Sequence, residues 1–234
     1  MCGRFVSTSS PERISSYFGA SFDTDPIEAN YEANYNVAPT TDVLGVVAGQ
    51  GGAPVVRSYH WGLVPSWAKD VKVGSRMINA RAETLAEKPA FRRSFLKHRI
   101  IVPMDGFYEW QVVPGQKTKQ PIYIHRVDDE PLAVAGLWAA WRDPAIGDDA
   151  PWLHSCTVIT TSANDVIMPI HDRMPVVLPQ SRWAEWLDTS NCDLEGLSSL
   201  FVAAPDELLV LTPVSTEVNN VRNRGPALIE ALAS

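Results

Sequence analysis

The sequence predicts a single α+β domain over residues 1–234, built on a mostly antiparallel, barrel-like β-sheet with helices at its periphery. With 234 residues, 45% of them hydrophobic, the chain is long enough to bury one full core. Strand-like runs are numerous and irregularly spaced, and the connections between them are often too short for repeated βαβ crossovers. No repeat, low-complexity tract or change of composition marks a second domain.

The first predicted element is a short amphipathic helix. The tetrapeptide SSPE at residues 9–12 has the S-x-x-E form of a capping box. Apolar residues follow at helical spacing, and Gly19 ends the pattern. Next, two runs rich in β-branched residues, Asp42–Ala48 and Val55–Tyr59, flank the sequence GQGGAP. Together they predict a hairpin with a loose turn.

A second helix is predicted at Pro89–His98, because phenylalanines fall on one of its sides and basic residues on the other. The rest of the chain mixes strands with short helices. Strands are predicted at Arg99–Pro103, Gly106–Val112, Pro121–His125, Leu132–Trp138, Cys156–Thr161 and Leu208–Thr212, and helices at Arg182–Leu187, Leu194–Phe201 and Pro226–Leu232.

The composition excludes several classes of protein. No stretch approaches the roughly 20 apolar residues that span a bilayer, and the N-terminus lacks the layout of a secretory signal. We therefore expect a cytoplasmic protein without a membrane partner. The three cysteines form no C-x-x-C and no His/Cys spacing typical of zinc sites. Reduced thiols are expected, with no metal and no cofactor.

The charge argues against a protein that binds nucleic acid over its whole surface. The formal net charge is −7 and the pI is near 5.2, whereas sequence-independent binding depends on Lys and Arg that neutralise phosphates. The acidic residues gather in short runs, however, and many basic residues lie in stretches poor in acids. This distribution leaves room for a local basic face.

Four residues combine a reactive or polar side chain with surroundings that look buried: Cys2, Asn79, Glu109 and His171. Each has an ordinary structural explanation when taken singly: an inert second residue, a turn amide, an exposed strand carboxylate and a core histidine. The context favours chemistry for two of them. Glu109 lies among aromatic residues, which would raise the pKa of its carboxyl and suit it to proton transfer near neutral pH. His171 lies in a stretch stiffened by prolines on both sides.

Seven short motifs then suggest a relationship. They occur in the order MCGRF, YNVAPT, HWGLVPSWAKD, NARAET, PAFRRSF, VPMDGFYEW and IHDRMPVVL. In order and separation they resemble the motifs of the SOS response-associated peptidase (SRAP) family, whose members shield abasic sites in single-stranded DNA by covalent crosslinking. The resemblance covers Cys2 to about Leu187, and the C-terminal tail has no distinctive match. One departure is that Ile100 and Ile101 stand in a strand where the family often has a cysteine, at a position that we expect to be core.

The resemblance implies a role for the N-terminal cysteine. Once Met1 is removed, by the protein itself or by an aminopeptidase, Cys2 carries an α-amine beside its thiol. The amine would form a Schiff base with the aldehyde of the opened abasic sugar, and the thiol would close a thiazolidine ring in a reversible crosslink. Reference pKa values of about 7.7–8.0 for the amine and about 8.5 for the thiol suit this chemistry.

It also implies the roles of the other residues. Asn79 would orient the Cys2 amine or the opened sugar, Glu109 would move protons, and His171 would act at the sugar's ring oxygen. Four further residues are candidates for contact with DNA: Arg4, Arg81 and Arg173, each of which lies next to a catalytic motif, and Trp67. The arginines would hold phosphates, and Trp67 would stack on an unpaired base. Trp61, in contrast, is expected to be core.

The same resemblance implies a partner and a location. The partner would be single-stranded DNA that contains abasic sites, with replication-fork proteins as further candidates. The protein would act as a monomer and would associate with the nucleoid during DNA damage.

Three other functions remain open at this level. An N-terminal-nucleophile amidohydrolase would use the Cys2 thiol on an amide with its own amine as base. A peptidase that acts on other proteins would also use a Cys and a His. A noncovalent single-strand binder would need no reactive N-terminus, but the acidic balance of the chain disfavours it.

Overall fold

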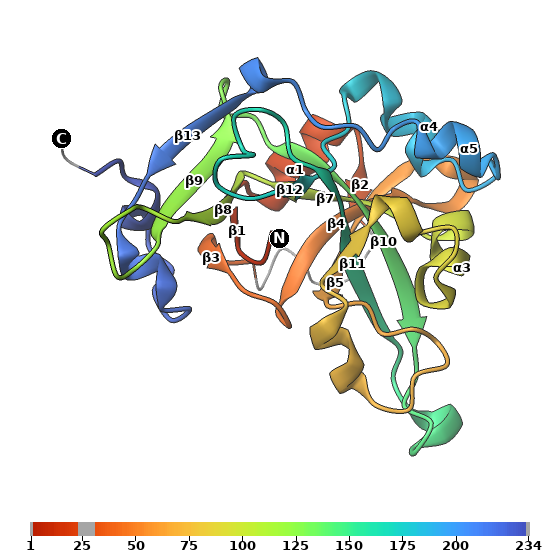
Figure 1. Ribbon diagram of the computed structural model, residues 1–234. Helices are drawn as coiled ribbons and strands as arrows, with labels where there is room; N and C mark the ends of the chain where they lie inside the picture. Colours follow the sequence, from red (N-terminus) through yellow and green to blue (C-terminus); the bar gives the residue numbers. More distant parts are fainter. Residues whose placement is uncertain (1, 23–30, 233–234) are drawn as a thin grey trace.

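Two β-sheets organise the protein in a computed structural model that describes residues 2–22 and 31–232 (Figure 1). The larger sheet runs in the order β12 (Arg173–Pro175), β11 (Leu153–Ser162), β10 (Leu132–Trp141), β7 (Arg99–Met104), β4 (Asp42–Ala48), β5 (Pro54–Trp61) and β2 (Ser21–Phe22), and β6 (Asn79–Arg81) pairs with β11. Because β11 also pairs with β5, five of these strands close into a ring. The barrel-like prediction is therefore confirmed.

The smaller sheet brings the start of the chain together with its last strand. It runs in the order β13 (Leu209–Pro213), β9 (Gln120–Arg126), β8 (Gly106–Gln111), β1 (Phe5–Ser7) and β3 (Asn34–Val37). All of its pairings are antiparallel. In the larger sheet, as far as the described residues form it, only the contacts of β11 with β5 and β6, and of β2 with β5, are parallel. The α+β class and the mostly antiparallel pairing are as predicted.

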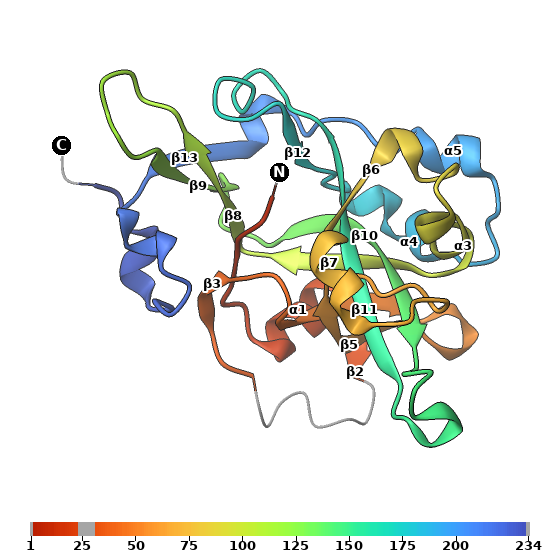
Figure 2. The ribbon, with the colours of Figure 1, turned by 60° about the horizontal axis from the view of Figure 1, so that its bottom comes forward.

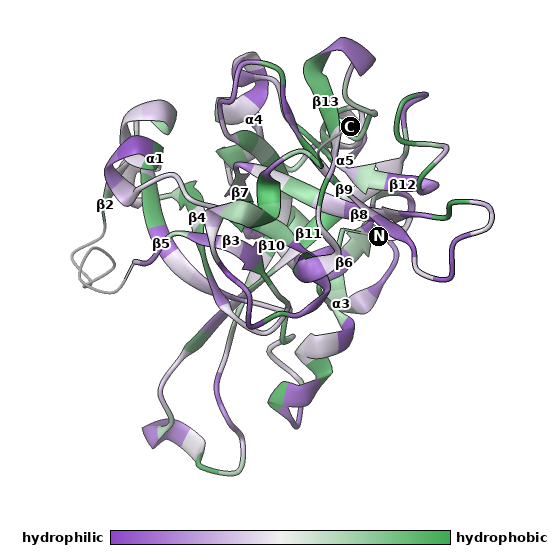
Figure 3. Cartoon of the chain, turned by 90° about the vertical axis from the view of Figure 1, so that its left-hand side faces the viewer, coloured by the Kyte–Doolittle hydropathy of each residue, from purple (hydrophilic) through white to green (hydrophobic). Residues whose placement is uncertain are grey.

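Hydrophobic residues are frequent along the strands of both sheets (Figure 3), and they form the buried clusters of the core. One buried cluster joins the larger sheet to the helices, for example Ile101 and Val46 to Phe95. A second cluster lies between the two sheets, and Cys2 and Phe5 belong to it. The N-terminal segment is thus part of the core. No helix within the described ranges is both long and apolar enough to cross a membrane.

The helices lie at the periphery, as predicted. Within residues 2–22 and 31–232 they are α1 (Pro11–Phe18), α3 (Pro89–Lys97), α4 (Trp183–Leu187) and α5 (Leu194–Ser198), supplemented by short 3₁₀ turns. Figures 1 and 2 show α3, α4 and α5 on one side of the barrel. Phe201, just after α5, contacts Phe95 of α3 and Trp186 of α4, with ring centroids 5.5 and 5.7 Å apart.

A buried arginine joins these helices to the barrel. Arg99, the first residue of β7, is fully buried, and its guanidinium lies 5.7 Å from the ring centre of Trp186. Its side chain donates hydrogen bonds to five backbone carbonyls, those of Phe95, Leu96, Trp186, Asp188 and Asn191. Arg99 therefore supplies donors to carbonyls at the C-terminal ends of two helices, which have no partner within their own helix.

The capping-box prediction for the first helix is wrong by one residue. Ser10 caps α1 and accepts a hydrogen bond from the Arg13 amide at 3.3 Å. Pro11 takes the first helical position, where its missing N–H costs nothing. Ser9 is buried and donates its hydroxyl to the Asp105 carboxylate.

Two of the later helix predictions are also too long. The predicted helix Leu194–Phe201 ends at Ser198, because the chain turns there to bring Phe201 into the core cluster. The predicted terminal helix Pro226–Leu232 is a 3₁₀ turn at Pro226–Ile229. The last residues of the predicted helix are extended instead, because Ala231 forms an antiparallel β-bridge with Val214.

Candidate functional site

The pairing of β1 with β8 fixes the position of the N-terminal cysteine. Phe5 pairs with Phe107, and the Tyr108 amide donates to the Arg4 carbonyl at 2.9 Å. Because the two strands are antiparallel, the residues before Arg4 run along the part of β8 that carries Glu109. Cys2 is fully buried there.

An asparagine from the larger sheet holds this cysteine from the other side. Asn79 begins β6, and its register with Val158 of β11 brings its side chain to the N-terminal segment. The Asn79 Nδ2 donates to the Cys2 carbonyl at 2.7 Å. Its Oδ1 is buried and accepts no hydrogen bond from the described residues. The Asn79 Oδ1 can therefore still accept a hydrogen bond from a donor beside Cys2.

Burial raises the pKa of two neighbouring groups at this point, the Glu109 carboxyl and the Cys2 thiol. It raises the pKa of the Glu109 carboxyl, which is only 3% exposed. It also raises the pKa of the Cys2 thiol, and the negative charge of Glu109 raises it further. The thiol is thus protonated near neutral pH, and its attack requires a base. Glu109 holds its proton to a higher pH than an exposed glutamate, so it can exchange protons with a neighbour in this range.

His171 is held by the backbone of its own loop. Its amide donates to the Ile167 carbonyl at 3.0 Å, and its Nδ1 accepts from the Arg173 amide at 3.0 Å. The same Nδ1 lies 2.9 Å from the Asp172 carboxylate, a contact that becomes a hydrogen bond only if the ring is protonated. Burial lowers the pKa of His171 and outweighs the opposing effect of Asp172, so we assign the neutral ring. With Nδ1 accepting, the proton lies on Nε2.

The three predicted phosphate-binding arginines differ in how many hydrogen bonds their guanidinium groups already make within the protein. Arg4 donates from its NH1 to the Asn36 side chain at 2.7 Å and to the Val218 carbonyl at 2.9 Å. Arg81, at the end of β6, is exposed and makes no side-chain hydrogen bond or ion pair with the described residues. Arg81 is the arginine of this set best placed to receive a phosphate.

The third arginine forms an ion pair that the sequence does not reveal. The NH1 and NH2 groups of Arg173 lie 2.5 and 3.0 Å from the two carboxylate oxygens of Glu83, and NH2 also donates to the Thr160 carbonyl at 2.5 Å. This hydrogen bonding lowers the pKa of Glu83. Since the Arg173 amide also contacts His171, the pair fixes the start of β12 beside the histidine.

The tryptophans divide as predicted into one exposed and one buried side chain. Trp67 is 62% exposed on a tight turn, in which the Ala68 amide donates to the Pro65 carbonyl at 2.8 Å. Trp61 is fully buried, and its indole donates to the Ile78 carbonyl at 3.0 Å. Ile100 and Ile101 are likewise buried, as expected for core positions.

Sequence reasoning overlooked two charged residues near the site, Glu83 and Lys119. The positive charge of Lys119 acts on both Glu109 and His171, which places this exposed lysine near them. Glu83 could have been noticed because it lies two residues after Arg81 in NARAET. Its pairing with a residue 90 positions away leaves no trace in the sequence.

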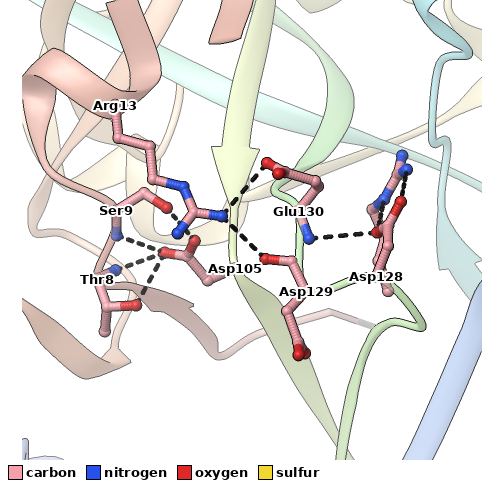
Figure 4. Close-up of polar contacts among 8 residues, drawn as sticks. Thr8, Ser9, Arg13, Asp105, Asp128, Asp129 and Glu130 are labelled. Atoms are coloured by element: carbon pink, nitrogen blue, oxygen red, sulfur yellow. Dashed lines mark hydrogen bonds and ion pairs between the residues drawn. The ribbon is translucent and has the colours of Figure 1, made fainter. Parts of the chain in front are cut away.

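A carboxylate anchors the far end of β1 and so supports the position of Cys2 (Figure 4). Asp105 Oδ2 accepts from the amides of Thr8 and Ser9 at 2.5 and 2.8 Å, and from the Thr8 hydroxyl at 3.1 Å. Arg13 of α1 donates in turn to the Asp129 carbonyl and to Glu130. The chain is therefore fixed immediately after the strand that places Cys2.

The described residues contain no cluster of three or more His, Cys, Asp or Glu side chains that could hold a metal ion. The three cysteines, Cys2, Cys156 and Cys192, form no disulfide. Among the predicted site residues, the structure thus links Cys2 directly to Asn79 and, through electrostatic effects, to Glu109. Met1, whose removal is part of the prediction, lies outside the described residues.

Comparison with known proteins gives a consistent result. The family described as "SOS response associated peptidase (SRAP)" matches residues 1–221. The abasic site processing protein YoqW of Bacillus subtilis is 40% identical over 231 residues, which cover 99% of this chain and 100% of that protein. The abasic site processing protein YedK of Escherichia coli is 31% identical, over 98% of this chain and 99% of that protein.

A vertebrate relative and a solved structure extend the comparison. The abasic site processing protein HMCES of Xenopus tropicalis is 30% identical over 99% of this chain and 78% of its own length. A crystal structure of a Bacteroides thetaiotaomicron protein superposes with a TM-score of 0.87 at 24% identity, over 99% of this chain and 100% of that chain. That structure shows the same fold.

Proposed function

The chain belongs to the SOS response-associated peptidase family, and on this basis we propose that it shields abasic sites in single-stranded DNA. After Met1 is lost, by the protein's own peptidase activity or through an aminopeptidase, Cys2 forms a reversible thiazolidine crosslink with the abasic sugar. A monomeric state, association with the nucleoid during DNA damage, and contacts with replication-fork proteins are further parts of this proposal.

One observation carries the proposal: the hydrogen bond from Asn79 to the Cys2 carbonyl, at a buried point where burial and then the negative charge of Glu109 raise the pKa of the Cys2 thiol. It joins three of the four predicted catalytic residues, which lie up to 107 positions apart in the sequence. The Asn79 Oδ1, which accepts no hydrogen bond from the described residues, suits an α-amine at residue 2, because an amine can donate to it.

The reaction begins with opening of the sugar. In the closed form, C1′ carries a hydroxyl and is bonded to the ring oxygen. His171 donates the Nε2 proton to the ring oxygen as its bond to C1′ breaks, and the proton of the C1′ hydroxyl passes through water back to Nε2 as the aldehyde forms, so the imidazole ends neutral.

Cys2 then acts twice on the same carbon. Its α-amine adds to C1′ and passes one proton to the carbonyl oxygen, Glu109 protonates the resulting hydroxyl, and water leaves to give the protonated imine. The sulfur then adds to C1′, its proton returns to the Glu109 carboxylate, and the electron pair of the C=N bond moves to nitrogen. The balance is one aldehyde and one aminothiol giving one thiazolidine and one water.

Intact-mass spectrometry tests the proposal. The purified protein should lack one methionine, and mixing it with a single-stranded abasic oligonucleotide should give an adduct equal to the sum of both masses minus one water. A chain that retains Met1 and still forms the adduct would contradict the role of the α-amine. Release of a hydrolysed amide product without any DNA adduct would favour the N-terminal-nucleophile amidohydrolase instead.

Arg81→Ala should weaken noncovalent binding of single-stranded DNA and reduce the slope of log affinity against log salt by about 0.7, because one phosphate contact is lost. Fluorescence anisotropy at several salt concentrations measures this slope. Arg222→Ala, which removes another exposed arginine, serves as the matched control and should leave the slope unchanged. Equal slopes for the wild type and Arg81→Ala would mean that Arg81 contacts no phosphate.

A further inference from the structure

A carboxylate lies between two of the arginines that are expected to hold phosphates. Arg81 ends β6, and Glu83 lies two residues later in the 3₁₀ turn that follows. In the sheet, Thr160 of β11 pairs with Arg81 on one side and with Pro175 of β12 on the other. Arg173, at the start of β12, reaches across β11 to Glu83, and its NH2 group also donates to the Thr160 carbonyl. The two arginines and the glutamate therefore form one cluster around Thr160.

Glu83 is the outer member of its ion pair with Arg173. The two carboxylate oxygens lie 2.5 and 3.0 Å from NH1 and NH2 of the guanidinium. The Arg173 side chain is only 11% exposed, whereas that of Glu83 is 52% exposed. A DNA strand that approaches from the solvent therefore meets the carboxylate before it meets the guanidinium.

The ion pair uses the same donors that a phosphate would need. A guanidinium binds carboxylates and phosphates alike through two parallel N–H groups. In Arg173 these are NH1 and NH2, since its Nε is buried and makes no hydrogen bond with the described residues. A phosphate can therefore bind Arg173 through both groups only if it displaces the Glu83 carboxylate.

The neighbouring arginines keep this carboxylate charged. Hydrogen bonding to Arg173 lowers the pKa of Glu83, and the positive charges of Arg173 and Arg81 act in the same direction. Glu83 is therefore ionised near neutral pH. Its negative charge repels a phosphate that approaches either arginine.

We propose that Glu83 is a specificity-determining residue that lowers the affinity of the protein for undamaged single strands. Its carboxylate holds the position on Arg173 that a phosphate would take, so noncovalent binding must first break the ion pair. Selection of a strand then depends mainly on the reaction of Cys2 with an aldehyde, which undamaged DNA lacks. This inference rests on the proposed function and extends it to the discrimination between abasic and undamaged strands.

Noncovalent binding of an undamaged single strand tests this inference. Affinities are measured by fluorescence anisotropy with an oligonucleotide of about 15 nucleotides. Glu83→Gln keeps the shape of the side chain but removes its charge, and it should bind about fivefold more tightly than the wild type, because no ion pair has to be broken. Glu83→Asp keeps the charge and should bind more weakly than Glu83→Gln. If the ion pair served only to hold Arg173 in place, Glu83→Gln would instead weaken binding.

Two further variants separate the ion pair from the general charge of the protein. Glu87→Gln is the matched control, because it removes the same charge from an exposed position four residues away. It should change the affinity by less than about twofold. Adding Arg173→Gln to Glu83→Gln should cancel the gain, since the guanidinium that the carboxylate covers is then absent.

A competition experiment measures discrimination directly. The concentration of undamaged strand that halves the crosslinking of an abasic strand should be about fivefold lower for Glu83→Gln than for the wild type. If Glu83→Gln binds undamaged DNA no more tightly than the wild type, while the wild type crosslinks abasic DNA, the inference is wrong and the proposed function stands. A wild type that forms no adduct with abasic DNA would overturn the proposed function, and this inference with it.

Discussion

Cys2→Ser is expected to abolish the heat-stable crosslink to abasic DNA. The variant keeps the α-amine, so the imine still forms, but a hydroxyl is a far weaker nucleophile toward the imine at neutral pH. The ring cannot close, and the imine remains open to hydrolysis and to β-elimination of the strand. Denaturing electrophoresis after heating should show wild-type adduct without reductant, whereas Cys2→Ser adduct should appear only after trapping with borohydride, together with more cleaved DNA.

Cys192→Ser provides the control, because Cys192 is an exposed thiol that contacts Lys97 rather than the N-terminal segment. It should crosslink like the wild type. An equally heat-stable adduct from Cys2→Ser without borohydride would show that sulfur is not part of the bond, and the thiazolidine mechanism would then be abandoned.

The second large effect concerns stability, and we expect it at Arg99. Arg99→Ala leaves several buried helix-terminal carbonyls without a donor and opens a cavity beside Trp186. We expect a loss of about 4 kcal/mol in the free energy of unfolding. For a chain of this size, that corresponds to a fall in melting temperature of roughly 8–16 °C.

Denaturant unfolding followed by tryptophan fluorescence measures this loss. Arg92→Ala, which removes an exposed arginine of α3, should change the free energy of unfolding by no more than about 0.5 kcal/mol. A loss below about 1 kcal/mol for Arg99→Ala would contradict this prediction, because it would show that water donates to these carbonyls almost as well as the guanidinium does.

The long elements could be predicted from the sequence because each has its own local pattern. The hairpin of β4 and β5 and helix α3 lie within two residues of their predicted positions. Strands β1, β2, β3, β6 and β12 are absent from the prediction, since two to four residues are too few to show an alternation. These short strands are held by their partners in the sheets, which local sequence cannot reveal.

Contacts between distant residues of the candidate site were also beyond prediction from local sequence. Cys2, Asn79, Glu109 and His171 were identified as unusual from their contexts, but their grouping came from the family resemblance. The hydrogen bonds that Arg4 and Arg173 make within the protein could not be predicted, because their partners Val218 and Glu83 are 214 and 90 positions away in the sequence. Residue type alone therefore overstates how many arginines are open to phosphate.

The contact between Arg4 and Val218 also has a consequence for the order of events during synthesis. Asn36, which accepts from Arg4, donates to the carbonyls of Val218, Asn220 and Asn223, so the first strands of the smaller sheet are completed by the last segment of the chain. At typical translation speeds of about 5–20 residues per second, the ribosome needs on the order of 10 to 40 s to reach these residues. The strands β1 and β3 are therefore made early, whereas the carbonyls that hold Arg4 and Asn36 are made late, so a nascent chain carries the first strands of the smaller sheet without these partners.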